Sequence, residues 1–328
     1  MAGYVLGAYI GGTTIRIGLF DGEKLVQSIK LPTKSSDPIQ AFKDIAQFAK
    51  KKGIGIEKAG IAVAGPIMRG KVKMVNSPHS LSLKDLQKAI GVRNVLLIND
   101  FEAAAYGVNA LQKEEAVLLN RARPKERGVK AIIGAGTGLG KALLVYDEES
   151  KAYLAIPSEE GHSHLPVNDE EEFALLKFLK SRNKRDIVYW EDVLSGNGIV
   201  SLYEFASQDA PSPLKDTISK SKDLAAAISL GRNSDPACRK AFELFARFYA
   251  RFAKTTALSC LPFGGLYIAG GIAMKNPDIL SSAEFRREWE NAGVMKGMVK
   301  SIPLLRIKNE DLGLRGAALK ARLHKFIN

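Results

Sequence analysis

The sequence predicts an α/β protein with a duplicated core. A turn rich in glycine and threonine joins two apolar strands in residues 4–20, and the same pattern of strand, turn and strand returns in residues 129–147, about 120 residues later. Segments with helical and strand periodicity alternate after each copy. A single core rarely grows beyond about 250–300 residues, so two copies of one unit in a chain of 328 residues indicate two α/β domains.

The first copy starts a series of elements with clear local signals. Ile15, Ile17 and Leu19 alternate with polar or small residues, which is typical of a half-buried strand, so residues 4–20 are predicted to form a β-hairpin. Asp37 and Pro38 provide an N-cap and a first-turn proline for the next helix. The predicted elements are a helix at 38–51, strands at 60–64, 72–75 and 95–98, a helix at 82–90 and a helix that begins near Asp100.

The second copy follows the polar stretch 121–127, which contains Pro124 and is the natural connection between the two halves. Ser234 or Asp235 is expected to cap a long helix. The elements predicted after the second hairpin are helices at 169–179 and 236–259, a strand within 265–272 that runs into a further glycine turn, and a last helix at 313–326.

Composition and charge exclude several classes of protein. The chain has 48 Lys and Arg against 35 Asp and Glu, a formal charge of +13. Its basic clusters at 121–125 and 180–185 are short and lack interleaved aromatic residues, so we expect a solvated surface and no nucleic-acid partner. A positive field also favours an anionic small-molecule substrate.

The cysteine content and the hydropathy pattern predict where the protein resides. Cys238 and Cys260 are too few and too far apart for a disulfide scaffold or a cysteine-based zinc site, which favours a reducing compartment. No window approaches the roughly 20 apolar residues of a membrane span, and the N-terminus lacks the basic and apolar regions of a signal peptide. We therefore expect a cytoplasmic protein with no membrane partner.

Three glycine-rich turns follow apolar strands, at Gly11-Gly12-Thr13, at 134–140 and at Gly270-Gly271. Each turn alone is more typical of a tight hairpin. Together they favour a phosphate-binding clamp, because glycine lets successive backbone N–H groups converge on an anion. None has the Gly-Lys-Ser/Thr end of a P-loop, and a strand follows the 134–140 turn where a dinucleotide-binding fingerprint requires a helix.

Asn99-Asp100 ends the predicted strand 95–98 directly before a helix. Ligands of open α/β sheets bind at the carboxyl ends of strands, so this pair is well placed to bind hydroxyl groups and to accept a proton. The alternative is that Asp100 only caps the helix.

Two further polar clusters are candidates for ligand binding. Glu160, His162 and His164 would lie on one face of a strand, as a metal site requires, but the absence of cysteine and of a second histidine cluster argues against zinc. Recognition of a polyol by Glu159 and His162 is favoured instead. Glu191 begins an acidic pair that precedes a Ser-Gly turn, where a simple helix cap is the alternative.

The motifs together resemble the bacterial-type glucokinases, a family of the actin-like sugar kinase superfamily. The resemblance spans nearly the whole chain and rests on segments in the family's order and spacing: Gly11-Gly12-Thr13, Ala64-Gly65-Pro66-Ile67, Asn99-Asp100-Phe101, residues 134–140, Glu159 to His162, Glu191 to Gly196, and residues 268–272.

The resemblance implies a two-domain actin-like (ribonuclease H-like) fold with an interdomain cleft in which ATP and glucose meet. The smaller domain would comprise residues 1–110, completed by the C-terminal helix in 310–328, and the larger domain residues 111–309. The implied reaction is the ATP-dependent phosphorylation of glucose to glucose 6-phosphate with Mg²⁺, and dimers are common among similar kinases, so a homodimer is possible.

The resemblance also assigns roles to individual residues. Asp100 would be the general base for the sugar 6-hydroxyl. The residues that would hold glucose are Asn76, Asn99, Asp100, Glu159, His162 and Glu191. The residues that would border the nucleotide are Gly11, Gly12, Thr13, Thr14, Gly136, Thr137 and Gly138 around the triphosphate, and Gly270 and Gly271 at the adenosine. No residue is assigned as a direct metal ligand.

The chain departs from the family pattern at four places. Tyr9 stands where the family has the aspartate that organises hydrated magnesium, and a phenol is neutral at pH 7. Thr14 replaces an asparagine, the family's Asn-x-x-Trp loop reads Asn76-Ser77-Pro78-His79, and Glu160 replaces the first glycine of Glu-Gly-Gly-His. Two alternatives follow: a sugar-binding regulatory relative with impaired turnover because of Tyr9, or the same chemistry on another sugar or with another phosphoryl donor.

Overall fold

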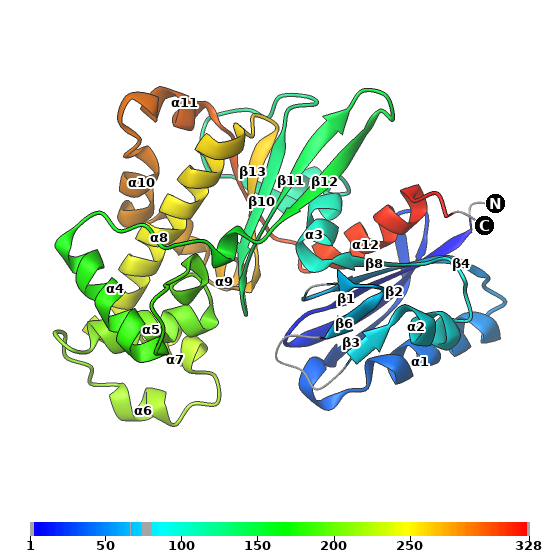
Figure 1. The fold of residues 1–328 in the computed structure, drawn as a ribbon, viewed down its shortest axis with the longest axis horizontal. Helices are drawn as coiled ribbons and strands as arrows, with labels where there is room; N and C mark the ends of the chain where they lie inside the picture. Colours follow the sequence, from blue (N-terminus) through cyan, green and yellow to red (C-terminus); the bar gives the residue numbers. More distant parts are fainter. Residues whose placement is uncertain (1–2, 66, 74–79, 327–328) are drawn as a thin grey trace. The chain divides into compact units, whose positions relative to one another are not determined.

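The computed structural model describes residues 3–65, 67–73 and 80–326 of the chain (Figure 1). The chain forms two compact units. The first comprises Met1–Ala116, Ala142–Pro157 and Asn309–Asn328, and the second comprises Val117–Lys141 and Ser158–Lys308. The expected domain limits at residues 110 and 309 stay a prediction.

The first sheet has five strands in the order β3-β2-β1-β4-β8. β1 and β2 form the predicted antiparallel hairpin, with Val5 opposite Phe20 and Ile10 opposite Ile15. β4 and β8 add to β1 in parallel. The strand bounds are Tyr4–Ile10 for β1, Thr14–Asp21 for β2, Lys24–Pro32 for β3, Ile56–Val63 for β4 and Val95–Asn99 for β8.

The second sheet has six strands in the order β12-β11-β10-β13-β14-β9. Apart from the edge strand β9, this order repeats that of the first sheet. In each sheet the third, second and first strands of one copy lie side by side in that order, and two later strands follow. The predicted duplication is therefore confirmed. The bounds are Ala116–Leu118 for β9, Lys130–Ala135 for β10, Leu139–Asp147 for β11, Ala152–Ser158 for β12, Gly265–Ala269 for β13 and Leu304–Ile307 for β14.

A small third sheet has the order β5-β6-β7, with bounds Ile67–Met68, Lys71–Lys73 and Ser80–Ser82. The strand predicted at 72–75 overlaps β6, and its last two residues lie outside the described part of the chain.

The helices of the first unit are α1 at Pro38–Lys51, α2 at Leu83–Ile90, α3 at Asp100–Val108 and α12 at Leu312–Leu323. Those of the second unit are α4 at Glu170–Asn183, α5 at Gly196–Ala206, α6 at Lys215–Ser219, α7 at Leu224–Gly231, α8 at Pro236–Cys260, α9 at Gly271–Lys275, α10 at Ala283–Glu290 and α11 at Lys296–Ser301. Single 3₁₀ turns are η1 at Thr33–Ser35, η2 at Lys113–Glu115, η3 at Glu160–His162, η4 at Trp190–Asp192, η5 at Pro277–Ser281 and η6 at Gly293–Met295.

Local sequence signals predicted some helix ends correctly and others wrongly. The predicted helix at 38–51 is confirmed, and the Asp37 carboxylate accepts a hydrogen bond from the Ile39 backbone N–H. The predicted end of the last helix at 326 is wrong, because His324 has an extended backbone and α12 stops at Leu323. The predicted end of α4 at 179 is also wrong, because the helix continues to Asn183.

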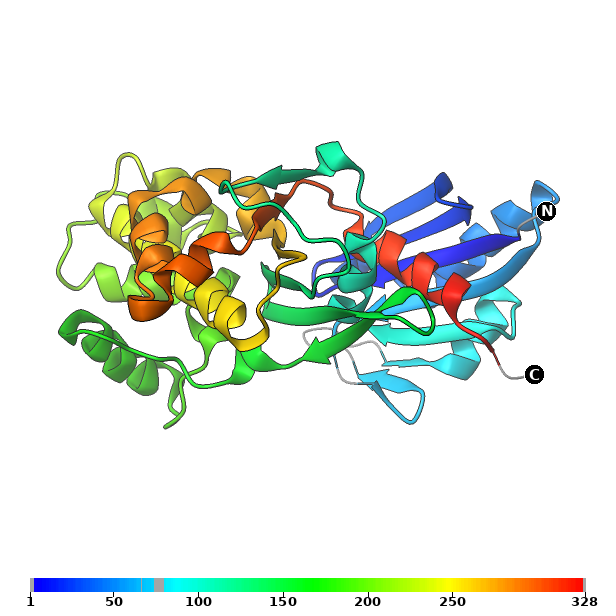
Figure 2. The same cartoon turned by 90° about the horizontal axis from the view of Figure 1, so that it is seen from above.

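Alternation along β1 divides the core of the first unit into two layers. Leu6, Ala8 and Ile10 are fully buried in a cluster with apolar residues of α1 and α2. The residues between them face α12, where Val5 packs with Leu314. In both views α12 lies beside the blue strands of the first sheet (Figure 1, Figure 2). The sheet is therefore covered on both faces, as its apolar strands require.

The long helix α8 forms the centre of the second unit. Its Phe245, Phe248 and Phe252 are fully buried. Arg251, also on α8, forms ion pairs with Glu172 of α4 at 2.6 Å and with Glu288 of α10 at 3.0 Å. These buried charges are paired, so α8 connects its two neighbours by polar as well as apolar contacts. Within the described residues, no helix combines the length and the apolar character needed to cross a membrane.

Close packing of α12 against α3 gives a test of the first unit. A Cβ atom at Gly316 would lie 1.7 Å from the Ala103 carbonyl oxygen. We expect Gly316→Ala to lower the free energy of unfolding by about 1–3 kcal/mol or more, because backbone atoms must move apart. Urea unfolding followed by circular dichroism measures the effect.

Gly297 is the matched control, since it lies in helix α11 and a Cβ there would meet nothing within 4 Å. Gly297→Ala should be neutral or stabilise the protein by up to about 1 kcal/mol through helix propensity. Equal effects of the two substitutions would contradict the packing described for α12.

Candidate functional site

Polar groups follow the carboxyl ends of the parallel strands in the first sheet. The register aligns Ile10 of β1 with Val63 of β4, and Val63 with Asn99 of β8. Gly11 and Asp100 are therefore the next residues on strands that end at the same edge. This edge is where ligands of open α/β sheets bind.

Asn99 and Asp100 share the start of α3. The Asn99 side-chain oxygen accepts hydrogen bonds from the N–H groups of Phe101 at 2.8 Å and Glu102 at 3.1 Å, so Asn99 is the N-cap of the helix. Asp100 is the first residue of α3, and its Oδ1 also accepts from the Phe101 N–H, at 2.9 Å. The capping that the sequence suggested for Asp100 is performed mainly by Asn99. One turn into the helix, burial raises the pKa of Glu102, while Lys320 and the Asn99 backbone oppose this.

The first glycine turn is fastened by a buried threonine. The Gly11 N–H donates to the Thr14 carbonyl at 3.0 Å and closes the turn. Thr33 donates its hydroxyl to the Gly11 carbonyl at 2.8 Å and its backbone N–H to the Thr13 carbonyl at 3.0 Å. Thr33 is fully buried, whereas Thr13 at the tip of the turn is exposed. The turn is thus held from behind and presents its tip to a ligand.

Tyr9 lies between this turn and Asp100. A Cβ atom on Gly11 would lie 2.8 Å from the Tyr9 ring, and one on Gly313 would lie 2.6 Å from it, so two glycines make room for the ring. Burial raises the pKa of Tyr9 well above its ordinary value, and the Asp100 carboxylate raises it further, while Arg16 opposes these effects. The phenol is therefore neutral at physiological pH and lies close enough to Asp100 to feel its charge.

Arg16 carries a positive charge that opposes the rise in the pKa of Tyr9. It pairs across the hairpin with Tyr9. Its guanidinium forms ion pairs with Glu310 at 2.5 Å and with Asp311 at 2.8 Å, at the start of α12. The positive charge of Arg16 is therefore neutralised by these two carboxylates.

The second glycine turn contacts the start of α5. Gly136 donates its N–H to the Gly138 carbonyl at 2.8 Å, and the Gly196 N–H donates to the Gly136 carbonyl at 2.8 Å. The Thr137 side chain, between the two glycines, is exposed. Ser195 caps α5, since its hydroxyl accepts from the Gly198 N–H at 3.0 Å; a helix cap here is the alternative that the sequence left open. The turn is therefore anchored at both ends with its tip open.

The third glycine turn lies beside the second. β10 and β13 are parallel, with Gly134 aligned to Ala269. Gly270 has a φ of +90°, and a Cβ there would lie 2.4 Å from the Ala135 carbonyl oxygen, so only glycine fits. Tyr249 of α8 joins the two strands, because its hydroxyl accepts from the Ala135 N–H and donates to the Ala269 carbonyl, each at 3.3 Å. Burial raises the pKa of Tyr249.

Three of the predicted sugar-binding residues meet beside the second glycine turn. Glu191 Oε2 accepts a hydrogen bond from the Leu139 N–H at 2.8 Å, and its other oxygen lies 3.9 Å from His162 Nε2. His162 Nδ1 lies 3.6 Å from Glu159 Oε2. The side chains of Glu159 and His162 are 78% and 54% exposed, so they are open to a ligand, while Glu191 is 33% exposed. Two carboxylates and an imidazole in this arrangement can accept and donate several hydrogen bonds to a polyol.

The structure therefore gathers the predicted residues into two groups, one in each unit. Asn99, Asp100 and Gly11 to Thr14 lie in the first unit, and Glu159, His162, Glu191 and the other two glycine turns lie in the second. Asn76 lies outside the described residues. The possible strand face of Glu160, His162 and His164 is wrong, because Glu160–His162 form a 3₁₀ turn.

Sequence reasoning missed three residues that hold the glycine turns and the sugar cluster in place: Thr33, Tyr249 and Lys141. The first two look like ordinary residues of an element. Lys141 carried a signal, since it is a lone cation between the glycine turn and the apolar stretch Ala142-Leu143-Leu144-Val145.

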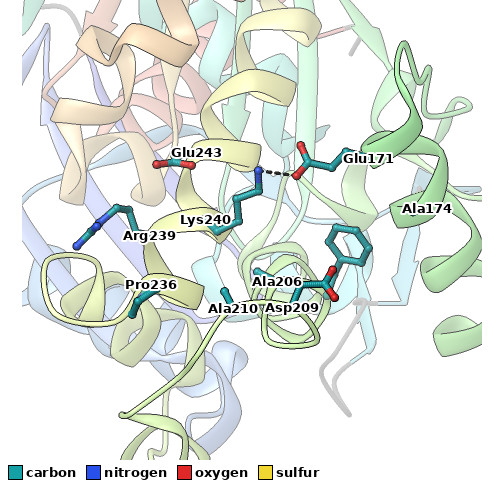
Figure 3. A pocket seen from close by; sticks show the side chains of 10 residues that line it. Glu171, Ala174, Ala206, Asp209, Ala210, Pro236, Arg239, Lys240 and Glu243 are labelled. Atoms are coloured by element: carbon teal, nitrogen blue, oxygen red, sulfur yellow. Dashed lines mark ion pairs between the residues drawn. The ribbon is translucent and has the colours of Figure 1, made fainter.

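Two other features of the structure bear on ligand binding: groups of possible metal ligands and a pocket. Among the residues that the structure describes, no group of three or more His, Cys, Asp or Glu side chains could hold a metal ion. A pocket of about 530 Å³ lies among α4, α5 and α8 (Figure 3). It contains none of the predicted site residues, and its Lys240 forms an ion pair with Glu171 at 2.5 Å.

Comparisons with known proteins test the family and the fold of the chain. The glucokinase family model matches residues 6–324. A glucokinase of Nostoc punctiforme is 35% identical over 337 residues, which cover 97% of this chain and 98% of the relative. The crystal structure of a glucokinase from an Antarctic psychrotroph aligns with a TM-score of 0.79 at 25% identity and covers 98% of this chain and 99% of its own. A Balamuthia mandrillaris glucokinase solved with glucose aligns with a TM-score of 0.81 at 23% identity, covering 98% of this chain and 93% of its own.

These neighbours share the actin-like two-domain fold that the sequence predicted. The match of the family model extends over nearly the whole chain. The chain belongs to the glucokinase family.

Proposed function

We propose that this glucose kinase of the glucokinase family uses Asp100 as the general base while the γ-phosphoryl group of ATP is transferred to the 6-hydroxyl of glucose. The observation that carries the proposal is the position of Asp100. It follows β8 at the carboxyl edge of the first sheet, on the same edge as the Gly11 turn. Its carboxylate accepts the hydroxyl proton as the sugar oxygen attacks phosphorus and ADP leaves.

In this proposal, glucose is held by hydroxyl-binding side chains. Glu159, His162 and Glu191 are supported by their mutual contacts and exposure. Asn99 has its side-chain oxygen engaged by two backbone N–H groups of α3, which leaves its amide NH₂ to donate to the sugar. Asn76 keeps its proposed role on the family resemblance alone.

ATP is held by the glycine turns. Gly11, Gly12, Thr13 and Thr14 of the first unit, with Gly136, Thr137 and Gly138 of the second, bind the triphosphate, and Gly270 with Gly271 borders the adenosine. The exposed tips at Thr13 and Thr137 support this assignment, since hydroxyl and backbone N–H donors there are free of a covering side chain. Phosphoryl transfer depends mainly on such positioning and charge stabilisation.

Magnesium would enter with ATP. Mg²⁺ prefers phosphate oxygens, water and one or two carboxylates, and it neutralises charge on the transferring group when bound. Tyr9 is neutral and contributes no carboxylate, so the phosphates supply most of the ligands in this chain. The cytoplasmic location and the possible homodimer stay predictions.

The regulatory alternative depends on the same residue. If the missing carboxylate at position 9 prevented turnover, the protein would bind glucose and transfer phosphate poorly. The intact Asp100 and sugar cluster are compatible with both readings, and the family membership favours the enzyme.

Asp100→Asn tests the general base. We expect kcat for glucose-dependent ADP release to fall by about 10²–10⁴-fold, because the amide cannot accept the hydroxyl proton, while glucose binding by calorimetry persists. Asp85→Asn is the matched control. Asp85 also lies in the first turn of a helix in the first unit, and its loss should leave kcat unchanged. A fully active Asp100→Asn enzyme would refute the role given to Asp100.

Tyr9→Asp tests the magnesium assignment. We expect the new carboxylate to lower the Mg²⁺ concentration that gives half-maximal rate, because it adds a ligand of the kind that Mg²⁺ prefers. Tyr9→Phe keeps the ring between Gly11 and Gly313 and should behave as the parent. The measurement is the rate of ADP release across a magnesium titration. A nearly inactive parent that Tyr9→Asp restores would instead support the regulatory alternative.

A further inference from the structure

Lys141 is an unusual residue for its position. It is the third residue of β11 and only 4% exposed. An ammonium group is rarely buried to this degree unless it is paired, because desolvation disfavours the charge. Leu139 lies two residues earlier on the same strand, so the two side chains point to the same face of the sheet.

The partner of Lys141 is Glu160. The Lys141 ammonium forms an ion pair with Glu160 Oε2, and the Ser259 hydroxyl near the end of α8 lies 3.4 Å from the same nitrogen. The Glu160 side chain is 22% exposed. Glu160 stands where the family resemblance predicts glycine, so this pair is a feature of the present chain.

Glu160 belongs to the turn that carries the sugar-binding residues. The 3₁₀ turn Glu160–His162 places Glu160 directly between Glu159 and Gly161. Gly161 lies so close to β11 that a Cβ there would be 2.2 Å from the Leu139 carbonyl oxygen. The N–H of that same Leu139 donates to Glu191. The start of β11 therefore contacts both the 3₁₀ turn and Glu191, and the ion pair adds a second attachment of the turn to this strand.

We propose that the Lys141–Glu160 pair holds Glu159 and His162 in the positions relative to Glu191 that sugar binding requires. The inference rests on the proposed function of these residues. Neither member of the pair is assigned a contact with glucose: the Lys141 side chain is buried, whereas the carboxylate of Glu159 is exposed. Its effect is therefore exerted through the turn, and it acts on substrate binding more than on phosphoryl transfer.

Lys141→Met and Glu160→Gln each break the pair while keeping the size of the side chain. We expect each to raise KM for glucose by about tenfold, the scale on which small displacements of binding groups act, with much smaller changes in kcat and in KM for ATP. In the double variant, Glu160→Gln should add little to the effect of Lys141→Met, because the interaction is already lost. The measurements are steady-state kinetics in glucose and ATP and thermal unfolding of each variant.

Lys240→Met is the matched control, since Lys240 forms a more exposed ion pair with Glu171 in the same unit (Figure 3), in a pocket that contains none of the predicted site residues. It should leave KM for glucose unchanged. Variants at 141 and 160 that melt at lower temperature with unaltered KM for glucose would overturn the inference and make the pair a stabilising contact only. Additive effects in the double variant would overturn it as well.

Measurements on the parent enzyme distinguish a failure of this inference from a failure of the proposed function. A parent with glucose-dependent turnover and unaltered KM in both single variants would refute the positioning role alone. A parent that neither binds nor phosphorylates glucose would refute both.

Discussion

Direct backbone contact between α12 and the first sheet is the constraint on which the first half of the site depends. A Cβ at Gly60 of β4 would lie 2.0 Å from the Ala317 carbonyl oxygen, and one at Gly107 of α3 would lie 2.2 Å from that of Leu312. Only glycine permits this approach. α12 therefore contacts β4 and α3 at once, and through them it fixes the start of α3, where Asp100 lies. The C-terminal helix thereby becomes part of the scaffold for Asp100, the proposed general base.

Close approach organises the second unit in the same way, but there a carboxylate fills the space. A Cβ at Gly138 would lie 2.6 Å from Glu191 Oε2, which is why the Glu191 carboxylate can reach the Leu139 N–H. A glycine turn expected to bind phosphate thus also positions a residue expected to bind sugar. Tyr249 adds rigidity behind it by linking the ends of β10 and β13. In the proposed function, neighbouring parts of one backbone turn would therefore bind the two substrates, which would couple their positions.

Elements whose limits depend on local chemistry could be predicted from the sequence. The helix at 38–51 begins at an Asp-Pro pair, and α8 begins in the same way at Asp235-Pro236, so both starts were predictable. Ends without such signals were not. The residue that caps the end of α4, Lys184, has a left-handed backbone conformation, which a lysine in the sequence does not predict. α12 ends before a stretch that contains neither glycine nor proline. β4 starts at Ile56, four residues before the predicted start, because pairing with Tyr4 of β1 extends it.

The residues of the candidate site differ in the same way: local sequence signals predict some of them and not others. Asp100 and the glycine turns were predicted because their residue types follow predicted strands, and the acidic clusters were predicted because carboxylates and an imidazole suit a polyol. Lys141 and Glu160 were not linked, because a pair 19 residues apart is set by the packing of a turn on a strand. Thr33 was missed for the same reason, since it reaches the Gly11 turn from the far end of β3.

Tyr9 changes the electrostatics of the site more than its shape. A carboxylate at this position would place two negative charges next to each other, since Tyr9 is already near enough to Asp100 for that charge to raise the pKa of its phenol. Two neighbouring carboxylates repel each other unless a cation lies between them. A neutral ring removes the repulsion and with it part of the attraction for a divalent ion. The positive charge that ATP needs must then come with the magnesium of the nucleotide itself, because Arg16, the cation paired across the hairpin, is already neutralised by Glu310 and Asp311. In the proposed function, the chain would therefore use the magnesium complex of ATP rather than a metal site prepared before the nucleotide binds.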